Sequence, residues 1–142
     1  MNPIKTILAE IIRVYSKWLI LMYSLCTLLL LTTPPKVLLE LVLLPLLGLL
    51  VLCLHEIGHF IAIPKECRDR SLRFEVTRYA FKLIIERNCM SSKYIAHAVL
   101  YSLALPLLLI IVLHIANMFI AASVTSLLIL ILTCGDLLTL LK

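Results

Sequence analysis

Long uncharged stretches separated by short polar segments are the dominant pattern along this chain. No residue between Lys17 and Lys36 is charged, and a second apolar stretch runs from Val37 to Ile63. A third continues from Tyr94 to Gly135 without a formal charge. Because a helix needs roughly 17 to 25 apolar residues to cross the hydrocarbon of a bilayer, each stretch is long enough to span a membrane.

The third stretch is too long for a single crossing. Its 42 uncharged residues would form a helix about twice as long as the bilayer core is thick, so the chain must fold back once. The polar residues from His114 to Asn117 mark the expected turn. We therefore expect four transmembrane helices, over residues 18–35, 37–63, 94–114 and 117–140.

The segment before the first expected span has a different pattern. Apolar residues recur there at helical spacing, with most charged residues between them: Ile4, Ile7, Leu8, Ile11 and Ile12. This favours an amphipathic N-terminal helix at the membrane interface. A cleaved signal peptide is the alternative, but the following apolar run ends in Thr32-Thr33-Pro34-Pro35 rather than in a small-residue cleavage site.

The loop over residues 64–93 alternates apolar and polar positions in two places. Residues 72–77 and 79–84 both alternate, which allows a short β-hairpin between spans two and three. Several of the apolar residues also fit a helix, so both structures remain open for this loop.

Composition restricts the class of protein. Hydrophobic residues make up 63% of the chain, charged residues 15%, and the mean hydropathy is +1.12, which excludes soluble globular and disordered classes. Continuous apolar runs argue against an outer-membrane barrel, whose strands alternate. We expect an all-α membrane protein consisting of a single domain over residues 1–142.

The basic residues predict the orientation in the membrane. Of the 13 Lys and Arg residues, 12 fall in the two terminal segments and the 64–93 loop, and only Lys36 lies on the other side of the expected bundle. By the positive-inside rule, the 64–93 loop and both termini are cytoplasmic. A basic rim facing anionic lipid accounts for the net charge of +5, and no pattern of basic and aromatic residues suggests nucleic acid.

The cysteines carry little information about function. The five cysteines show no CxxC spacing, and those in the 64–93 loop, Cys67 and Cys89, are expected to be reduced in the cytoplasm.

The informative segment is His55-Glu56-Ile57-Gly58-His59, an HExxH sequence in the second expected span. Two histidines four residues apart lie on one face of a helix, so both imidazoles can bind the same zinc ion while Glu56 acts on the water. Inserting an ionisable group at membrane depth costs roughly 2.5 to 3.5 kcal/mol of free energy, so three such groups close together are unexpected unless they serve a function. Polar groups satisfied by interhelical hydrogen bonds are the structural alternative.

A catalytic zinc site usually has three protein ligands, so a third is needed. Asp136 is the candidate, because it lies in the last span at about the depth of His59, and the preceding Gly135 would allow close approach of the metal or another helix. An interfacial carboxylate paired with Lys142 is the alternative for Asp136.

Three further histidine or acidic residues lie in the expected spans, and one of them, His114 at the far end of the third span, is expected to be structural. His97, near the start of the third span, is a candidate donor to a developing oxyanion, although a hydrogen-bonded histidine at the interface is the commoner situation. Glu40 lies 15 residues before His55, about 22 Å along the helix, so it is expected outside the site, at the outer interface beside Lys36.

These residues resemble the intramembrane zinc metalloproteases related to site-2 proteases, and within them the small zincin peptidases. The resemblance covers the chain from about residue 40 onward and rests on the HExxH segment and on Cys134-Gly135-Asp136 in the last span. It implies Zn²⁺ held by His55, His59 and Asp136, with Glu56 as catalytic base. One departure from typical site-2 proteases is that no Asn-Pro segment followed by Asp-Gly is present, and Gly precedes Asp here.

The leading hypothesis is therefore an intramembrane zinc endopeptidase that cleaves membrane-spanning or membrane-inserted peptides near the cytoplasmic face. A noncatalytic membrane peptide-binding or immunity protein that keeps the fold is the first alternative. A metal-transporting bundle is the second, and it would need a polar path to the outer face, where only Glu40 and His114 are available.

Overall fold

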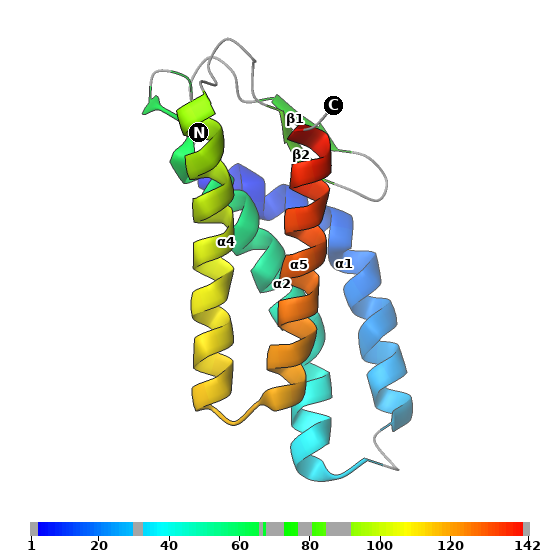
Figure 1. The fold of residues 1–142 in the computed structure, drawn as a ribbon. Coiled ribbons are helices and arrows are strands. Elements are labelled where there is room, and N and C mark those ends of the chain that lie inside the picture. Colours follow the sequence, from blue (N-terminus) through cyan, green and yellow to red (C-terminus); the bar gives the residue numbers. More distant parts are fainter. Residues whose placement is uncertain are drawn as a thin grey trace.

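The structure is a bundle of four long helices with a small β-sheet at one end (Figure 1). This computed structural model describes residues 3–29, 33–65, 67, 73–76, 81–84 and 92–140. The elements are α1 (Pro3–Leu29), α2 (Pro35–Ala62), β1 (Arg73–Val76), β2 (Phe81–Ile84), α4 (Ser92–Ile115) and α5 (Phe119–Leu140). Helix α2 is central, because it packs against α1, α4 and α5, while α4 and α5 also pack against each other.

Three of the helices are long and apolar enough to cross a membrane. They cover Pro35–Ala62, Tyr94–Ile115 and Phe119–Leu138, which agrees with the expected second, third and fourth spans. The expected first span, 18–35, is not among those found in the described part of the chain. Its described residues, 18–29, form one continuous helix, α1, with the amphipathic segment that precedes them.

The N-terminal part of α1 packs against protein rather than only against lipid. Ile7 and Ile11 are fully buried in a cluster with Cys53, Phe60 and Ile63 of the α2 segment. Figure 1 shows that the first part of α1 lies across the end of the bundle and that the rest runs alongside α2. The apolar stripe that predicted an interfacial helix is therefore used to support the HExxH end of α2.

Prolines set both ends of α2. Pro35 occupies the first turn, where its missing N–H costs no helical hydrogen bond. At the other end, Ile63 has extended backbone angles (φ −69°, ψ 131°) because Pro64 follows it and disfavours helical geometry in the residue before it. The HExxH sequence consequently lies in the last two turns of an otherwise apolar helix.

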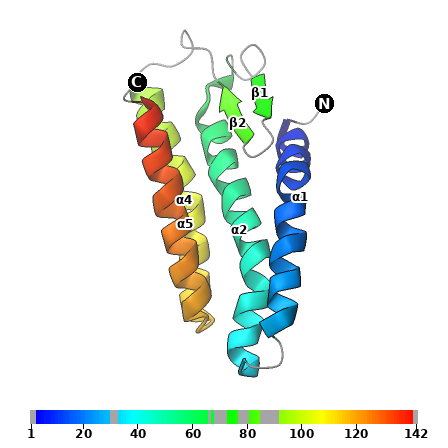
Figure 2. The same cartoon turned by 90° about the vertical axis from the view of Figure 1, so that its right-hand side faces the viewer.

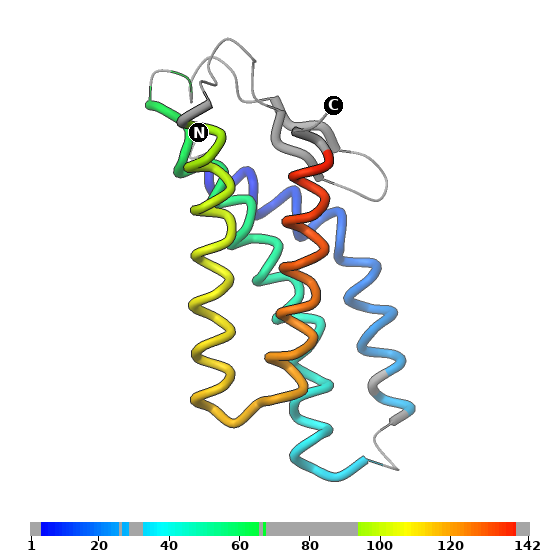
Figure 3. Tube along the Cα trace, viewed as in Figure 1, coloured from blue at the N-terminus to red at the C-terminus, as the bar shows by residue number. Residues whose placement is uncertain are grey.

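The turn predicted at residues 114–117 is confirmed. Asn117 has a positive φ of 55°, the Asn117 N–H donates to the His114 carbonyl at 3.0 Å, and the Met118 N–H donates to the Leu113 carbonyl at 2.9 Å. This is a Schellman termination with Asn in the left-handed position. It lets α5 start two residues later and return beside α4, as the trace in Figure 3 shows.

The two strands form a small antiparallel sheet. Arg73 pairs with Ile84 and Val76 with Phe81. The strands fall within the two alternating segments, 72–77 and 79–84, from which the sequence allowed a hairpin. In Figure 2 they lie at the end of the bundle that also carries both chain termini, while the α1–α2 and α4–α5 connections lie at the opposite end.

Two expectations about individual residues are wrong. Cys67 is disulfide-bonded, not reduced, whereas Cys53 and Cys134 are free; Cys89 lies outside the described residues. Glu40 does not face the outer interface beside Lys36, since it is 4% exposed and its Oε2 accepts a hydrogen bond from the Ala121 N–H at 3.0 Å. Burial between α2 and α5 gives this carboxylate a backbone donor that the sequence did not reveal.

Candidate metal centre

The two histidines of the HExxH sequence lie on one face of α2, one helical turn apart. Their ring planes are nearly perpendicular, with centroids 4.7 Å apart, and the two Nε2 atoms are separated by 3.2 Å. The spacing of four residues produces this pairing directly, because residues four apart lie above one another on a helix. Both imidazoles thus present the same ring nitrogen to one point.

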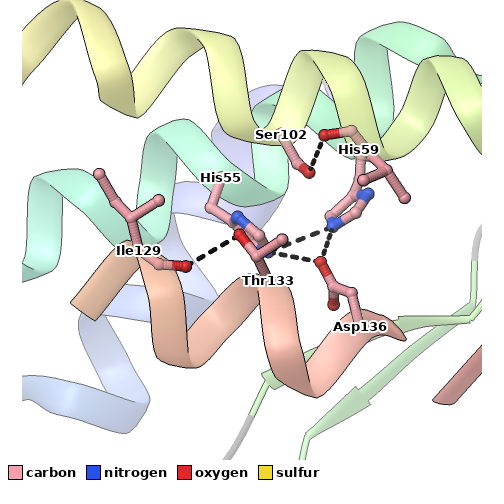
Figure 4. Close-up of polar contacts among 7 residues, drawn as sticks. His55, His59, Ser102, Ile129, Thr133 and Asp136 are labelled. Atoms are coloured by element: carbon pink, nitrogen blue, oxygen red, sulfur yellow. Dashed lines mark hydrogen bonds and ion pairs between the residues drawn. The ribbon is translucent and has the colours of Figure 1, made fainter. Parts of the chain in front are cut away.

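Asp136 of α5 reaches that point from the neighbouring helix. Its Oδ2 lies 2.9 Å from Nε2 of His55 and 2.9 Å from Nε2 of His59. Figure 4 shows the three side chains turned toward one another across the contact between α2 and α5. The fold therefore brings together the predicted ligands His55, His59 and Asp136, although Asp136 is 77 or more positions from the two histidines in sequence.

The three donor atoms have separations suited to one small divalent cation. In a tetrahedral zinc site with ligands about 2.0 to 2.1 Å from the ion, neighbouring ligand atoms are about 3.3 Å apart. The separations here are 2.9, 2.9 and 3.2 Å. Two imidazole nitrogens and one carboxylate oxygen are also donors that zinc accepts, and among the described residues these three form the one group that could hold a metal ion.

Burial decreases across the group. The side chain of His55 is 2% exposed, that of His59 is 17% and that of Asp136 is 30%. His55 therefore forms the floor of the site, and the side near Asp136 is the one open to a small ligand.

His55 lacks the second contact that metal-binding histidines usually have. Its Nδ1 is buried and has no hydrogen-bond partner among the described residues, whereas a ligating histidine normally donates its other ring N–H to an acceptor. The ring is held instead by packing and by its contacts with His59 and Asp136.

Glu56 lies beside the group without belonging to it. It is partly buried and close enough to His55, His59 and Asp136 to interact with them electrostatically, but it is not one of the three converging donors. When ionised, an acidic residue in this position adds negative charge next to a site that already contains a carboxylate. A bound divalent cation would compensate for both charges.

A glycine inside the HExxH sequence controls the distance between α2 and α4. A Cβ built on Gly58 would lie 2.5 Å from Ser102 Cα and 2.6 Å from the Tyr101 carbonyl oxygen, which is closer than real contacts permit. The backbones can approach this closely only because Gly58 has no side chain. Sequence reasoning missed this role, although a glycine between two ligands was a visible signal.

Gly135 does not serve the close approach of another helix that the sequence suggested. A Cβ added there would meet no atom of the described residues within 4 Å, and the expected approach of a metal stays a prediction. Asp136 reaches the histidines by the direction of its own side chain.

His97 is not part of the group of three. Its ring pairs with that of Tyr101 on α4, with centroids 6.4 Å apart in a tilted arrangement. Its predicted role as an oxyanion donor stays a prediction.

A comparison of this chain with protein-family models, with curated proteins and with solved structures finds no match. The function therefore has to be inferred from the chemistry of the residues just described.

Proposed function

We propose that this protein is an intramembrane zinc metallopeptidase of four spans that hydrolyses peptide bonds in membrane-spanning or membrane-inserted polypeptides. The observation that supports it is the convergence of three donor atoms, His55 Nε2, His59 Nε2 and Asp136 Oδ2, within 3.2 Å of one another. Glu56, adjacent to His55 in the HExxH sequence, supplies the acid–base group that such a site requires.

The donors fit zinc, and each residue then has a defined role. His55, His59 and Asp136 would hold the ion, which when bound lowers the pKa of water to near 7 and polarises a carbonyl. The Glu56 carboxylate takes the proton of the attacking water and gives it to the leaving amine. Because His55 is buried and Asp136 is partly exposed, the substrate would reach the site from the Asp136 side.

An apolar hollow elsewhere in the bundle is compatible with an apolar peptide as substrate. A hollow of about 140 Å³ between α1, α2 and α5 is lined almost entirely by apolar atoms. Its lining residues are Tyr15, Trp18, Leu19, Met22, Pro45, Gly48, Leu49, Leu52 and Leu128. Of these lining residues, Leu52 is the nearest in sequence to the site, one turn before Glu56 on α2.

The substrate has to be unwound before it can be cleaved, because a helix hides its peptide carbonyls in internal hydrogen bonds. The β1–β2 sheet lies at the same end of the bundle as the site, and an edge of such a sheet can align an extended peptide. With the termini and the 64–93 loop in the cytoplasm, as the basic residues predict, cleavage occurs near the cytoplasmic face.

The test is Glu56→Gln in purified protein reconstituted with a panel of single-span peptides of differing helix stability, with cleavage followed by mass spectrometry. Loss of a general base should reduce turnover on the order of 100-fold to 10,000-fold, while zinc content stays near one per chain. His114→Ala, an exposed histidine near the end of α4 away from the sheet, is the matched control and should keep full activity.

Equal cleavage by the wild-type and Glu56→Gln proteins would contradict the peptidase proposal. Zinc binding together with peptide binding, but with no cleavage of any peptide, would instead support the noncatalytic alternative. The transport alternative is weakened by Glu40, whose Oε2 accepts the Ala121 N–H and so is engaged within the bundle rather than exposed on an outer path.

A further inference from the structure

A second polar contact joins α2 to α5 at the end of the bundle opposite the candidate metal centre. Glu40 Oε2 accepts a hydrogen bond from the Ala121 N–H at 3.0 Å, across 81 positions of sequence. Glu40 is 4% exposed and Ala121 is fully buried. A carboxylate buried in so apolar a bundle is costly unless a specific interaction offsets the cost.

Ala121 needs this acceptor because of its place in α5. The Ala122 N–H already bonds to the Met118 carbonyl, which makes Met118 the N-cap and leaves the Ala121 N–H among the first-turn groups with no helical partner. Methionine has no side-chain oxygen to cap that N–H, so Glu40 of α2 supplies the oxygen. Its position at a helix N-terminus also places negative charge where the helix dipole favours it.

The two contacts between α2 and α5 are equally spaced along both helices. His55 follows Glu40 by 15 residues in α2, and Asp136 follows Ala121 by 15 residues in α5. Both helices run from the end that holds Glu40 to the end that holds the metal ligands (Figure 2). At about 1.5 Å per residue, each separation is about 22 Å, so the two parallel helices meet in register at both places.

Close packing between the helices keeps this register. Around the Glu40 contact, Ala121, Ala122 and Leu113 are buried and packed against Leu44 and Leu47 of α2. Midway along, a Cβ on Gly48 would lie 3.9 Å from Leu128 Cδ2, an ordinary contact between the same two helices. The helices therefore touch near both ends and between them.

We infer that Glu40 is a positioning residue that fixes α5 along α2 at the height at which Asp136 meets His55 and His59. The inference rests on the metal site of the proposed function. A slip of one residue would move Asp136 by about 1.5 Å along the axis and by about 100° around it. Either change would break the 2.9 Å contacts of Asp136 with the two histidines. The position of Asp136 relative to them therefore depends on the hydrogen bond between Glu40 and Ala121.

The experiment compares Glu40→Leu with Glu40→Gln in the full chain in detergent micelles. Leucine is close to glutamate in size and leaves no large cavity, but it cannot accept the Ala121 N–H. Glutamine keeps an acceptor oxygen. Leu39→Ala, at the exposed neighbouring position, is the matched control.

Zinc affinity, from competition with a chromophoric chelator, is the first measurement. Glu40→Leu should bind zinc 10-fold to 100-fold more weakly, the range typical of lost supporting contacts around a metal site. Glu40→Gln should stay within a few-fold of wild type, and Leu39→Ala should not change. In cobalt-loaded protein, the visible absorption bands should change in Glu40→Leu alone, because a merely less stable fold would lower occupancy without altering the ligand geometry.

A register measurement without metal separates this inference from the proposed function. Spin labels at the exposed positions Leu46 of α2 and Leu130 of α5, with the native free thiols replaced, report the distance between the helices. Glu40→Leu should shift or broaden that distance by about 1.5 Å or more, and Glu40→Gln should not. If wild-type protein binds no zinc, the proposed metal site fails while this distance still tests the register.

Three results would overturn the role of Glu40. They are wild-type distances in Glu40→Leu, wild-type zinc affinity in Glu40→Leu, and loss of zinc binding in Glu40→Gln equal to that in Glu40→Leu. Should Glu40→Leu not fold, Glu40→Gln alone still decides the question, because the inference requires the glutamine variant to retain both the distance and the affinity.

Discussion

The two ends of the contact between α2 and α5 are built in different ways. At one end three side chains converge on a point, with separations of 2.9 to 3.2 Å, and their exposed fraction rises from 2% at His55 to 30% at Asp136. At the other end a single carboxylate accepts one backbone N–H in a fully packed environment of alanine and leucine. The first end brings together three donors that could hold a metal ion, and the second has its hydrogen bond satisfied within the protein.

In a small bundle, the alignment of two helices and the access of water to a site between them can thus depend on different regions. A site that admits substrate and water cannot be packed tightly around its most exposed ligand. The closely packed Glu40 contact supplies the alignment from about 22 Å away, where no access is needed. The following predictions test whether the two ends behave in these distinct ways.

The largest expected effect is the response of α5 to zinc. Zinc at 1,000 times its dissociation constant should stabilise the bound state by about 4 kcal/mol, equivalent to about 1,000-fold slower exchange of protected amides that open with the site. We expect slowing around residues 132–138 and little change around residues 119–123, measured by hydrogen exchange with mass spectrometry.

The Asp136→Asn variant is the control for this response, because an amide is a much weaker zinc ligand than a carboxylate and the local protection should then disappear. Equal slowing at both ends of α5 would show that the ends are not independent and would contradict the comparison.

An intermediate effect is expected from Gly58→Ala, which tests how closely the histidine-bearing helix is held. The added Cβ would lie 2.5 Å from Ser102 Cα, so α2 and α4 must separate. Overpacking of this kind typically costs about 1 to 3 kcal/mol. Thermal unfolding in detergent should show the loss, and unchanged stability would mean that the close crossing does not constrain α2.

The smallest effect is expected from Gly135→Ala, the corresponding test on the carboxylate-bearing helix. An added Cβ there meets nothing within 4 Å, and alanine is a better helix former than glycine by about 0.5 to 1 kcal/mol. Stability should rise by up to that amount and zinc affinity should not change. A marked loss of zinc affinity would show that Asp136 needs its glycine neighbour after all.

The sequence predicted those features that depend on local periodicity or on strong chemical preference. The HExxH spacing placed two imidazoles on one helical face, and the isolated carboxylate of Asp136 was a plausible third ligand because charged groups are rare at that depth. The turn near Asn117 followed from a polar interruption in an apolar run. Each of these signals is contained in one segment or in one unusual residue.

The sequence did not predict features that depend on which helix faces which. Glu40 was assigned to the outer interface because its partner, a backbone N–H, has no side-chain signature. Gly58 was given no packing role and Gly135 was expected to allow close approach, since only the crossing of α2 and α4 shows that Gly58 is the crowded one. The first of the four expected spans, residues 18–35, stays a prediction, because its described part continues without a break from the amphipathic segment.

The tight crossing at Gly58 has a consequence for how the centre can open. Moving α2 toward α4 at this point would drive its backbone into that of α4, so the crossing restricts displacement of both imidazoles in that direction. Asp136 lies on a different helix, α5, to which this restriction does not apply. A change in the distance between the carboxylate and the two rings would therefore have to come from α5 rather than from movement of α2 toward α4.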